Sequence, residues 1–390
     1  MERKLASIQR IVSIEPIEGA DKIVKATVLG WNCVTQKSNN FKPGDLVVYF
    51  EIDSMLPLDN PVFDFLKDPK KPERTHHRLK TIRLKGQIAQ GLILPIHLFD
   101  KIKTSIPQDD GSIATVDYML EVAGDEPARY PFKHIVDEGT DLTEVLGITK
   151  YEPEVPPQLA GLVEGAWPFF LSKTDETRIQ AAPGVLTRRK GELMYATEKI
   201  DGTSFTCYKY SRDLATSMNY PWKPEDEELG YKFGVCSRNL PLKKTDGNVY
   251  WKMVEKYNLE QKLVKYEKNL ALQGEIFGLG IQGNKLKRET IELAIFNVFD
   301  LETRQYLGTA ELNKVLADLG LTKVPEVYLP FVLDHTVDQL VVMAMVKSKL
   351  NPDVWAEGIV VRPVIESTEK DLGRFSFKVI NPEFLLKFGE

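Results

Sequence analysis

The segment Met194–Phe205 has the sequence MYATEKIDGTSF, and it indicates how the second half of the chain folds. Met194–Lys199 is predicted as a strand, because it is a short run that ends at the turn residues Asp201 and Gly202. In extended backbone the side chains of Lys199 and Asp201 point to the same side, and Gly202 lets the chain turn tightly. Four later stretches are also predicted as strands: Leu270–Gly274, Ala294–Phe299, Gly358–Arg362 and Phe375–Ile380.

Segments with the apolar spacing of helices are interspersed with these strands. Val249–Tyr266 and Ala310–Leu319 have that spacing, and Thr336 is placed to cap a helix over Val337–Leu350. This mixture of strands and helices favours an α+β domain built on antiparallel sheets. We expect the polar residues carried by its strands to meet in a cleft.

The first third of the chain is predicted as short strands broken by turns. Its five strand candidates are Ala6–Glu15, Ile23–Leu29, Leu46–Ile52, Thr81–Leu84 and Gly91–Pro95. Five closely spaced strands suit a small Greek-key barrel of the OB type, and such barrels commonly bind oligonucleotides. Residues 14–22 (IEPIEGADK) are similar to the first turn of OB modules that bind tRNA. A barrel used only for packing or assembly is the alternative.

The domain boundaries follow from these patterns. We predict an OB-fold nucleic-acid-binding domain over residues 1–150 that ends in a short helix within Asp141–Lys150. A linker over residues 151–160 follows, because the three prolines of Tyr151–Pro157 (YEPEVPP) disfavour regular structure. Residues 161–390 form the second domain.

Composition excludes several classes of protein. The formal net charge of −5 argues against polyanion binding over the whole surface, although a local basic groove is compatible with it. Basic clusters occur at Lys70–Lys85, Arg188–Lys190 and Lys285–Arg288, where solvated surface charge is the alternative to phosphate binding. Three cysteines without a metal or disulfide pattern, no membrane-spanning apolar run and no signal core favour a cytoplasmic protein.

Polar residues at the strands point to one chemistry. A lysine, a spacer, an acid and a glycine, as in Lys199–Gly202, are typical of enzymes that hold a nucleotide on lysine as a phosphoramidate. The nucleophile must be neutral when it attacks, so we expect burial and neighbouring cations such as Lys378 to lower the pKa of Lys199. The blocks that follow in order are Ser237–Asn239, Gln273–Gly278, Phe296–Asp300, Glu357–Val361 and Phe377–Lys378 with Lys387. Each block alone fits ordinary surface or core residues, and only their order supports a nucleotidyltransferase site.

Each block has an expected role. Asp201 and Glu357 are candidate ligands of a divalent metal, and Glu275 suits a ribose hydroxyl. Phe299 is expected to stack on adenine, with Phe296 in reserve. Arg238, beside Asn239, is suited to grip the phosphate of an RNA strand. The catalytic residues are predicted to be Lys199 and Lys378, and the residues expected to bind ATP or AMP are Glu198, Lys199, Gly202, Arg238, Glu275, Phe299, Lys378 and Lys387.

From about Lys173–Gln180 (KTDETRIQ) onward, the chain resembles the adenylyltransferase domain of ATP-dependent RNA ligases, an α+β nucleotidyltransferase (ATP-grasp-like ligase) fold. The whole chain resembles the subgroup with an N-terminal OB domain, and the ending FKVINPEFLLKFGE belongs to this resemblance. The resemblance implies a lysyl-AMP formed from ATP with Mg²⁺ or Mn²⁺. It also implies transfer of AMP to an RNA 5′-phosphate and sealing by a 3′-hydroxyl.

The sequence departs from the family pattern at a few positions. Phage-type relatives have a histidine where Asp201 stands and an asparagine where Ser204 stands. The usual lysine–spacer–lysine reads Lys378-Val379-Ile380, and Lys387 is only a possible replacement for the missing second lysine. The expected partners are RNA strands with 3′-hydroxyl and 5′-phosphate ends in a nicked duplex, together with end-healing enzymes, and no membrane.

Two alternatives to RNA ligation remain at this point. One is a DNA ligase or a capping-type nucleotidyltransferase built on the same motifs. The other is an RNA-binding OB protein whose catalytic domain has decayed. The placement of the OB domain before the nucleotidyl domain favours the RNA ligase.

Overall fold

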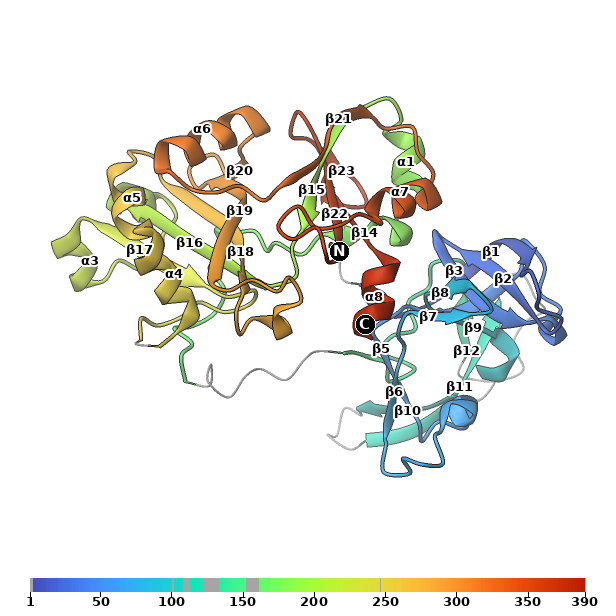
Figure 1. The fold of residues 1–390 in the computed structure, drawn as a ribbon. Coiled ribbons are helices and arrows are strands. Elements are labelled where there is room, and N and C mark those ends of the chain that lie inside the picture. The colour runs from blue at the N-terminus through green and yellow to red at the C-terminus, as the bar shows by residue number, and fades with distance from the viewer. Residues whose placement is uncertain are drawn as a thin grey trace. The chain divides into compact units, whose positions relative to one another are not determined.

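In this computed structural model the chain folds into two compact units (Figure 1). The structure describes residues 3–99, 102–107, 113–122, 133–151, 161–245 and 247–389. One unit comprises Met1–Pro153 with Gln180–Pro183 and Leu385–Glu390, and the other comprises Glu154–Ile179 with Gly184–Phe384. The predicted linker, apart from Tyr151, lies outside the described residues.

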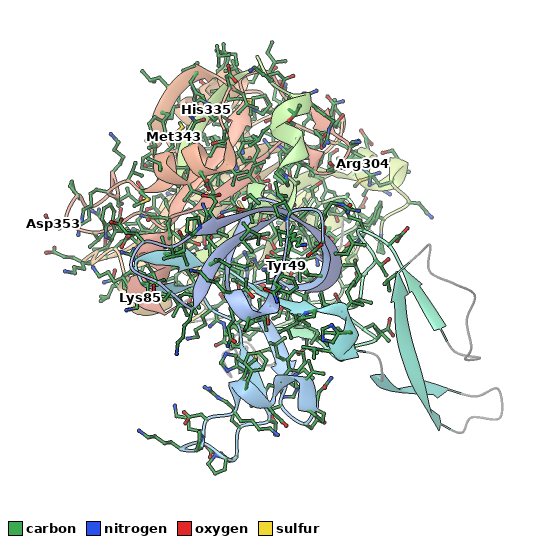
Figure 2. All side chains as sticks on the ribbon, turned by 90° about the vertical axis from the view of Figure 1, so that its right-hand side faces the viewer. Tyr49, Lys85, Arg304, His335, Met343 and Asp353 are labelled. Carbon is green, nitrogen blue, oxygen red and sulfur yellow. The ribbon has the colours of Figure 1, made fainter. Side chains whose placement is uncertain are left out.

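The N-terminal unit is built on a five-stranded antiparallel sheet of the order β3-β2-β1-β4-β9. Its outer strands β3 and β9 approach one another, which curls the sheet towards a barrel. The strands are β1 (Ala6–Pro16), β2 (Ile23–Val28), β3 (Trp31–Gln36), β4 (Leu46–Phe50) and β9 (Leu92–Pro95). Two buried clusters fill the unit, one around Phe50, Phe63 and Phe99 and the other around Trp31 and Tyr49. In Figure 2 Tyr49 lies within the curl of this sheet.

Shorter elements complete this unit. They are η1 (Lys37–Asn39), β5 (Ser54–Pro57), η2 (Pro61–Leu66), β6 (His76–Arg78), β7 (Ile82–Leu84), β8 (Gln87–Ala89), η3 (Ile96–Phe99), β10 (Ile102–Pro107), β11 (Ile113–Val122), β12 (Lys133–Val136) and β13 (Thr149–Lys150). Four predicted strands are confirmed in the sheet. The stretch Thr81–Leu84 forms β7 of a separate hairpin with β8 instead, and β3 takes the fifth place in the sheet.

The helix predicted within Asp141–Lys150 is wrong. A single set of turns is closed by hydrogen bonds from Leu146 N to Leu142 O (3.1 Å) and from Ile148 N to Thr143 O (2.8 Å). Gly147 then adopts φ +64°, and β13 pairs with β5. Because Gly147 has left-handed backbone geometry directly after this first turn, a right-handed helix cannot continue past it.

The C-terminal unit holds two five-stranded sheets, β14-β25-β22-β15-β21 and β17-β16-β18-β19-β20. Pairing within them is antiparallel except for β14 with β25, which is parallel. Their strands are β14 (Thr177–Arg178), β15 (Leu193–Lys199), β16 (Thr203–Ser211), β17 (Tyr231–Cys236), β18 (Leu270–Gly278), β19 (Ile291–Asp300), β20 (Gln305–Tyr306), β21 (Glu326–Val332), β22 (Gly358–Pro363) and β25 (Phe377–Ile380).

Helices α4 (Val249–Tyr257), α5 (Leu259–Lys265) and α6 (Thr309–Leu319) pack on one face of the second sheet around a large buried cluster (Figure 1). The one helix expected over Val249–Tyr266 is thus two, because Asn258 adopts φ 54° between them. Thr336 caps α7 (Val337–Ala344) as predicted, but that helix ends before Leu350. The other elements are η5 (Ile179–Ala181), α1 (Gly184–Arg188), α2 (Arg212–Ser217), α3 (Pro224–Leu229), η6 (Gln282–Asn284), β23 (Thr368–Glu369), β24 (Gly373–Arg374) and α8 (Pro382–Phe388).

No helix among the described residues is long and apolar enough to cross a membrane.

Candidate active site

Antiparallel pairing of β15 with β22 brings the predicted nucleophile beside a carboxylate. Lys199, the last residue of β15, is paired with Gly358, so Glu357 reaches it from the neighbouring strand. Lys199 Nζ lies 2.6 Å from Glu357 Oε2. Gly358 adopts φ +157°, and a Cβ there would lie 2.2 Å from Val379 O on β25. The glycine after Glu357 is therefore required by the close approach of two strands.

Two more acids lie near Lys199. Asp201 lies in the connection between β15 and β16, and Glu275 lies inside β18 of the second sheet, paired with Ser204 of β16. A Cβ on Gly202 would lie 2.3 Å from Ile276 O and 2.8 Å from Glu275 Cγ. A glycine is thus needed at position 202 because the chain passes close to the backbone of β18. The sequence analysis expected it for another reason, a tight turn beside the phosphate.

The carboxylates determine the charge on Lys199. Burial disfavours its ammonium form, but the carboxylates of Glu357, Glu275 and Asp201 outweigh that cost and raise the pKa of Lys199 above its ordinary value. The expectation of a lowered pKa is therefore wrong for the protein without ligands. Burial and the neighbouring acids in turn raise the pKa of Glu275 to about 8 and that of Asp201 to about 6.

Two cations face the same pocket from other strands. Lys378 of β25 lies 2.7 Å from Asp175 Oδ1, and Arg238, in the turn after β17, lies 3.7 Å from the same oxygen. Burial lowers the pKa of Lys378 to about 8, although Asp175 acts in the opposite direction. Asp175 thus bridges two cations, Lys378 and Arg238, that the sequence predicted to bind phosphates.

A single pocket collects most of these side chains. Its lining is formed by Thr174, Asp175, Glu176, Thr197, Glu198, Lys199, Ile200, Ser204, Arg238, Glu275, Phe296, Val324, Val360, Arg362 and Lys378. Residues 174–176 and Arg362 were missed as site residues. A signal exists for residues 174–176, because KTDETRIQ opens the stretch that resembles RNA ligases, but the sequence has none for a role of Arg362. The structure links this segment to the sheets through Thr174 and Ser204 hydroxyls 2.9 Å apart and through Glu176 and Arg362.

Phe299 does not lie in this pocket. Its side chain is 4 % exposed and packs edge-on against Tyr306, with ring centroids 4.9 Å apart, in a buried aromatic cluster. Phe296 lines the pocket instead. The pairing of β18 with β19 shifts register here, because Gln273 faces Asn297 whereas Gly274 faces Ile295, and Phe296 is the extra residue of this bulge. The structure therefore contradicts the expected stacking of Phe299 on adenine, and Phe296 is the phenylalanine of the two that lines the pocket.

Comparison with known proteins decides the family. An RNA ligase family model matches residues 192–380, and an OB-fold domain family matches residues 5–96. A variant of the Naegleria gruberi RNA ligase, solved with ATP and manganese, is 33 % identical to the chain with a TM-score of 0.77. That comparison covers 100 % of both chains. The chain belongs to the RNA ligase family.

Further solved structures of the Naegleria gruberi RNA ligase are similar to this RNA ligase. One, with AMP and manganese, is 33 % identical over 98 % of both chains with a TM-score of 0.75. Another, with pyrophosphate, has the same identity, coverage and TM-score. The search of curated proteins produced no match.

The remaining predicted residues of the ligase lie in other surroundings. The carboxylate of Glu198 accepts hydrogen bonds from Ser348 Oγ (2.5 Å) and Lys349 N (2.8 Å), so its side chain anchors that loop. Asn239 is exposed in the turn beside Arg238. Lys387 is exposed on α8, in the segment grouped with the N-terminal unit, and does not line the pocket.

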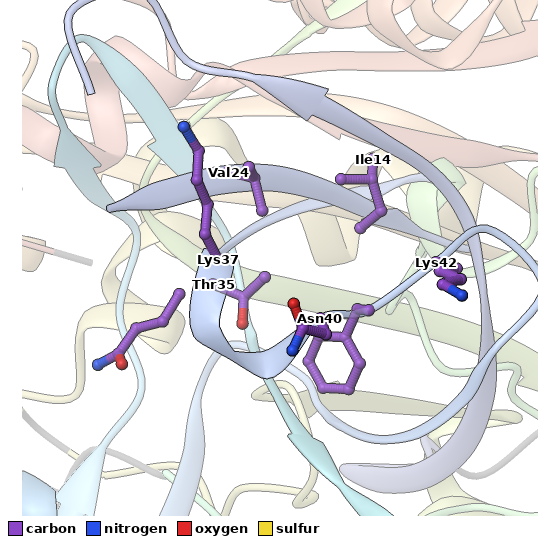
Figure 3. Close-up of a pocket in the computed structure, with 8 residues that line it drawn as sticks. Ile14, Val24, Thr35, Lys37, Asn40 and Lys42 are labelled. Atoms are coloured by element: carbon purple, nitrogen blue, oxygen red, sulfur yellow. The ribbon is translucent and has the colours of Figure 1, made fainter. Parts of the chain in front are cut away.

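A second cavity of the ligase, about 510 Å³, lies in the N-terminal unit at one end of the curled sheet (Figure 3). Ile14, Val24 and Thr35 line it from β1, β2 and β3, and Lys37 and Lys42 come from the segment after β3. No predicted site residue lies there.

Proposed function

We propose that this RNA ligase transfers AMP from ATP to Lys199, then to an RNA 5′-phosphate, and finally seals that end to a 3′-hydroxyl. The observation that carries the proposal is the meeting of Lys199, Glu275, Glu357, Arg238 and Lys378 around one pocket. The ATP, AMP and pyrophosphate complexes of the Naegleria ligase support it.

In the first step Lys199 Nζ attacks the α-phosphorus of ATP. The N–P bond forms while the bond from the α-phosphorus to the pyrophosphate oxygen breaks, and pyrophosphate leaves with that electron pair. Glu357 Oε2, 2.6 Å from Nζ, is placed to receive the proton whose loss converts the ammonium of Lys199 into the attacking amine. The second proton leaves to solvent as the N–P bond forms. Lys378 and Arg238 then stabilise the negative charge that develops on the phosphates.

The next steps return the enzyme to its starting state. An oxygen of the RNA 5′-phosphate attacks the phosphorus of lysyl-AMP, the N–P bond breaks, and Nζ regains a proton. The RNA 3′-oxygen then attacks the 5′-phosphorus, its proton is released, and AMP leaves with the electron pair of the broken P–O bond. Arg238 and Asn239, both exposed beside the pocket, are placed to hold the RNA phosphate.

The residues fit a hydrated divalent cation. Asp201 Oδ2 is buried and has no hydrogen-bond partner in the described structure, and Glu357 is its acidic neighbour in the site. Among the described residues, no group of three His, Cys, Asp or Glu side chains is placed to hold a metal ion. Mg²⁺ commonly binds through one or two carboxylates and keeps several waters. Mg²⁺ or Mn²⁺ held by Asp201 and Glu357 would offset the carboxylate charge that raises the pKa of Lys199 and would polarise the α-phosphate.

Phe296 and Phe299 make a matched pair for testing the base site. Phe296→Ala is expected to weaken ATP binding about tenfold, because stacking of a base on an aromatic ring is worth roughly 1–3 kcal/mol. Phe299→Ala should cost about 3–5 kcal/mol of stability with little change in ATP affinity of the folded protein, since it empties a buried cluster. Calorimetric ATP titration and urea unfolding of both variants measure these effects. If ATP binding were weaker in the folded Phe299→Ala protein and unchanged in Phe296→Ala, Phe299 would be the residue that stacks on adenine.

Affinity for the triphosphate should fall as pH rises through about 8. Burial holds the pKa of Lys378 at about 8, so the side chain is a cation below that pH and loses its attraction for phosphate above it. The dissociation constant of α,β-methylene-ATP is expected to rise by up to about tenfold per pH unit above 8. Glu275 titrates in the same range, so Lys378→Met is the control that isolates the lysine. Identical pH profiles for the two proteins would contradict this role of Lys378.

The substrates are RNA strands with 3′-hydroxyl and 5′-phosphate ends, held as a nicked duplex and prepared by separate end-healing enzymes in the cytoplasm. We assign the OB unit, residues 1–150, to RNA contact and residues 161–390 to adenylyl transfer. The RNA ligase family match favours this function over a DNA ligase, a capping-type enzyme or a decayed RNA-binding protein.

Label transfer tests the proposed function. The protein is incubated with α-labelled ATP or GTP and Mg²⁺ or Mn²⁺, and the denatured chain is examined for label before nicked RNA or DNA is added. Label from ATP that moves to RNA and yields sealed strands is the expected result. A preference for GTP or for DNA ends would favour one of the alternative enzymes. Folded protein free of bound AMP that takes no label would favour the decayed protein.

A further inference from the structure

One stretch of the N-terminal unit is unusually free of negative charge. Residues 74–99 contain five Lys or Arg residues and three of the chain's five histidines but no Asp or Glu, although the whole chain has a formal net charge of −5. The cations of this stretch are Arg74, Arg78, Lys80, Arg83 and Lys85. The adenylyl-transfer site does not use any of them.

The middle of this stretch is an exposed β-hairpin. Strands β7 and β8 pair through Ile82–Ala89, Arg83–Ile88 and Leu84–Gln87, and the turn at Lys85 and Gly86 has φ values of 49° and 82°. Ile82 and Leu84 are 47 % and 38 % exposed, which is unusual for a strand that packs on a core. Residues 80–89 are here named the basic hairpin.

Two charges of the basic hairpin, those of Lys80 and Lys85, are available to a partner. Among the residues that the structure describes, neither Lys80 nor Lys85 takes part in an ion pair or a side-chain hydrogen bond. Arg78, just before the hairpin, differs because its guanidinium lies 2.7 Å from Asp53 Oδ1 and over the ring of Tyr151. The hairpin therefore presents the unneutralised cations of Lys80 and Lys85 on either side of the exposed apolar side chains of Ile82 and Leu84.

The hairpin also lies at a suitable place in the fold. It belongs to the connection between β4 and β9, the last two strands of the curled sheet, and Gln90 N at its end donates a 2.8 Å hydrogen bond to Asn32 O of β3. In OB folds, the connection between the last two strands is one of the loops that flank the oligonucleotide-binding face. A strand of RNA crossing β3 would meet the hairpin.

We propose that the basic hairpin binds the phosphate backbone of the RNA substrate, with Lys80 and Lys85 as the contacting cations and Ile82 and Leu84 against the sugars. The proposal rests on RNA being the substrate, as inferred above. Because phosphates carry no sequence information, binding through the hairpin is independent of base sequence and depends strongly on salt.

The test compares two double variants of the full-length protein. Lys80→Ala with Lys85→Ala removes two charges from the hairpin, and Lys37→Ala with Lys42→Ala removes equal charge from exposed positions at the second cavity (Figure 3). Binding of fluorescently labelled single-stranded RNA is measured by anisotropy from about 50 to 300 mM salt. Loss of two phosphate contacts should reduce the slope of log K against log salt by about 1.4 and weaken binding about tenfold at low salt.

The outcomes separate the hairpin from the proposed function. Only the hairpin variant should lose RNA affinity and slope, while both variants take label from ATP on Lys199 at the wild-type rate. Equal losses in the two variants, or an unchanged slope in the hairpin variant, would overturn the proposal. A wild-type protein that binds RNA with the expected slope but takes no label would contradict the proposed function and leave the hairpin assignment standing.

Discussion

Replacing Lys199 with alanine is expected to abolish covalent attachment of AMP to the chain, leaving no label above background. No other lysine should replace it, because attack on the α-phosphate requires an amine held between the carboxylates at the end of β15. The measurement is label retained by the denatured protein after incubation with α-labelled ATP and Mn²⁺. Single-stranded RNA binding, followed by anisotropy, should stay near the wild-type value.

Two further variants separate chemistry from charge and folding. Lys199→Arg keeps a cation beside Glu357, but a guanidinium does not lose its proton in proteins and cannot act as the nucleophile. It should therefore fold with about the wild-type stability and remain unlabelled. Lys190→Ala, at a side chain 63 % exposed and paired with Asp334, is the matched control and should label normally. Label on Lys199→Ala or Lys199→Arg would refute the assignment of the nucleophile.

Lys378→Ala is expected to slow lysyl-AMP formation by about 10²–10³-fold, the usual effect of removing one preorganised donor from a developing charge. The cost in stability should be small. The variant breaks the ion pair with Asp175, whose side chain is 49 % exposed. Partly solvated ion pairs contribute little to the free energy of unfolding. Single-turnover labelling with saturating ATP measures the rate, and urea unfolding measures the stability.

Asp175→Asn is the companion variant for this test. It removes the carboxylate that bridges Lys378 and Arg238 in the protein without ligands. Both cations should then be freer to meet phosphates, so the KM for ATP should fall or stay unchanged while the fold is retained. A Lys378→Ala protein that forms lysyl-AMP at the wild-type rate would exclude the phosphate-clamp role.

The sequence was sufficient for much of the local structure. Strands such as β15 and β22 and the capped start of α7 were predicted within a few residues, because alternation, turn residues and capping side chains act over short stretches of chain. Prediction failed where one backbone conformation overrides the pattern. Gly147 ends the expected helix, and Asn258 divides another in two.

The residues of the candidate site also fall into those that the sequence predicted and those that only the structure revealed. Lys199, Glu275, Glu357 and Lys378 were named from motif order. Lys199, Glu275 and Lys378 line the pocket, and Glu357 contacts Lys199. Asp175 and Glu176 lie in a segment with a family resemblance, but no role for them or for Arg362 was predicted, because their contacts join segments far apart in the chain. The choice between Phe296 and Phe299 depended on a bulge between β18 and β19 that alternation along one strand does not predict.

By itself, the sequence determined the strands, the caps and the order of reactive residues, since these depend on the preferences of neighbouring residues. Only the tertiary structure decided their electrostatics. Lys199 and Glu357 are 158 residues apart in the chain, yet strand pairing brings their charged atoms to 2.6 Å. The pKa of each group then depends on burial and on charges that arrive from other strands, which is why the pKa of Lys199 is raised where its isolated motif suggested the opposite.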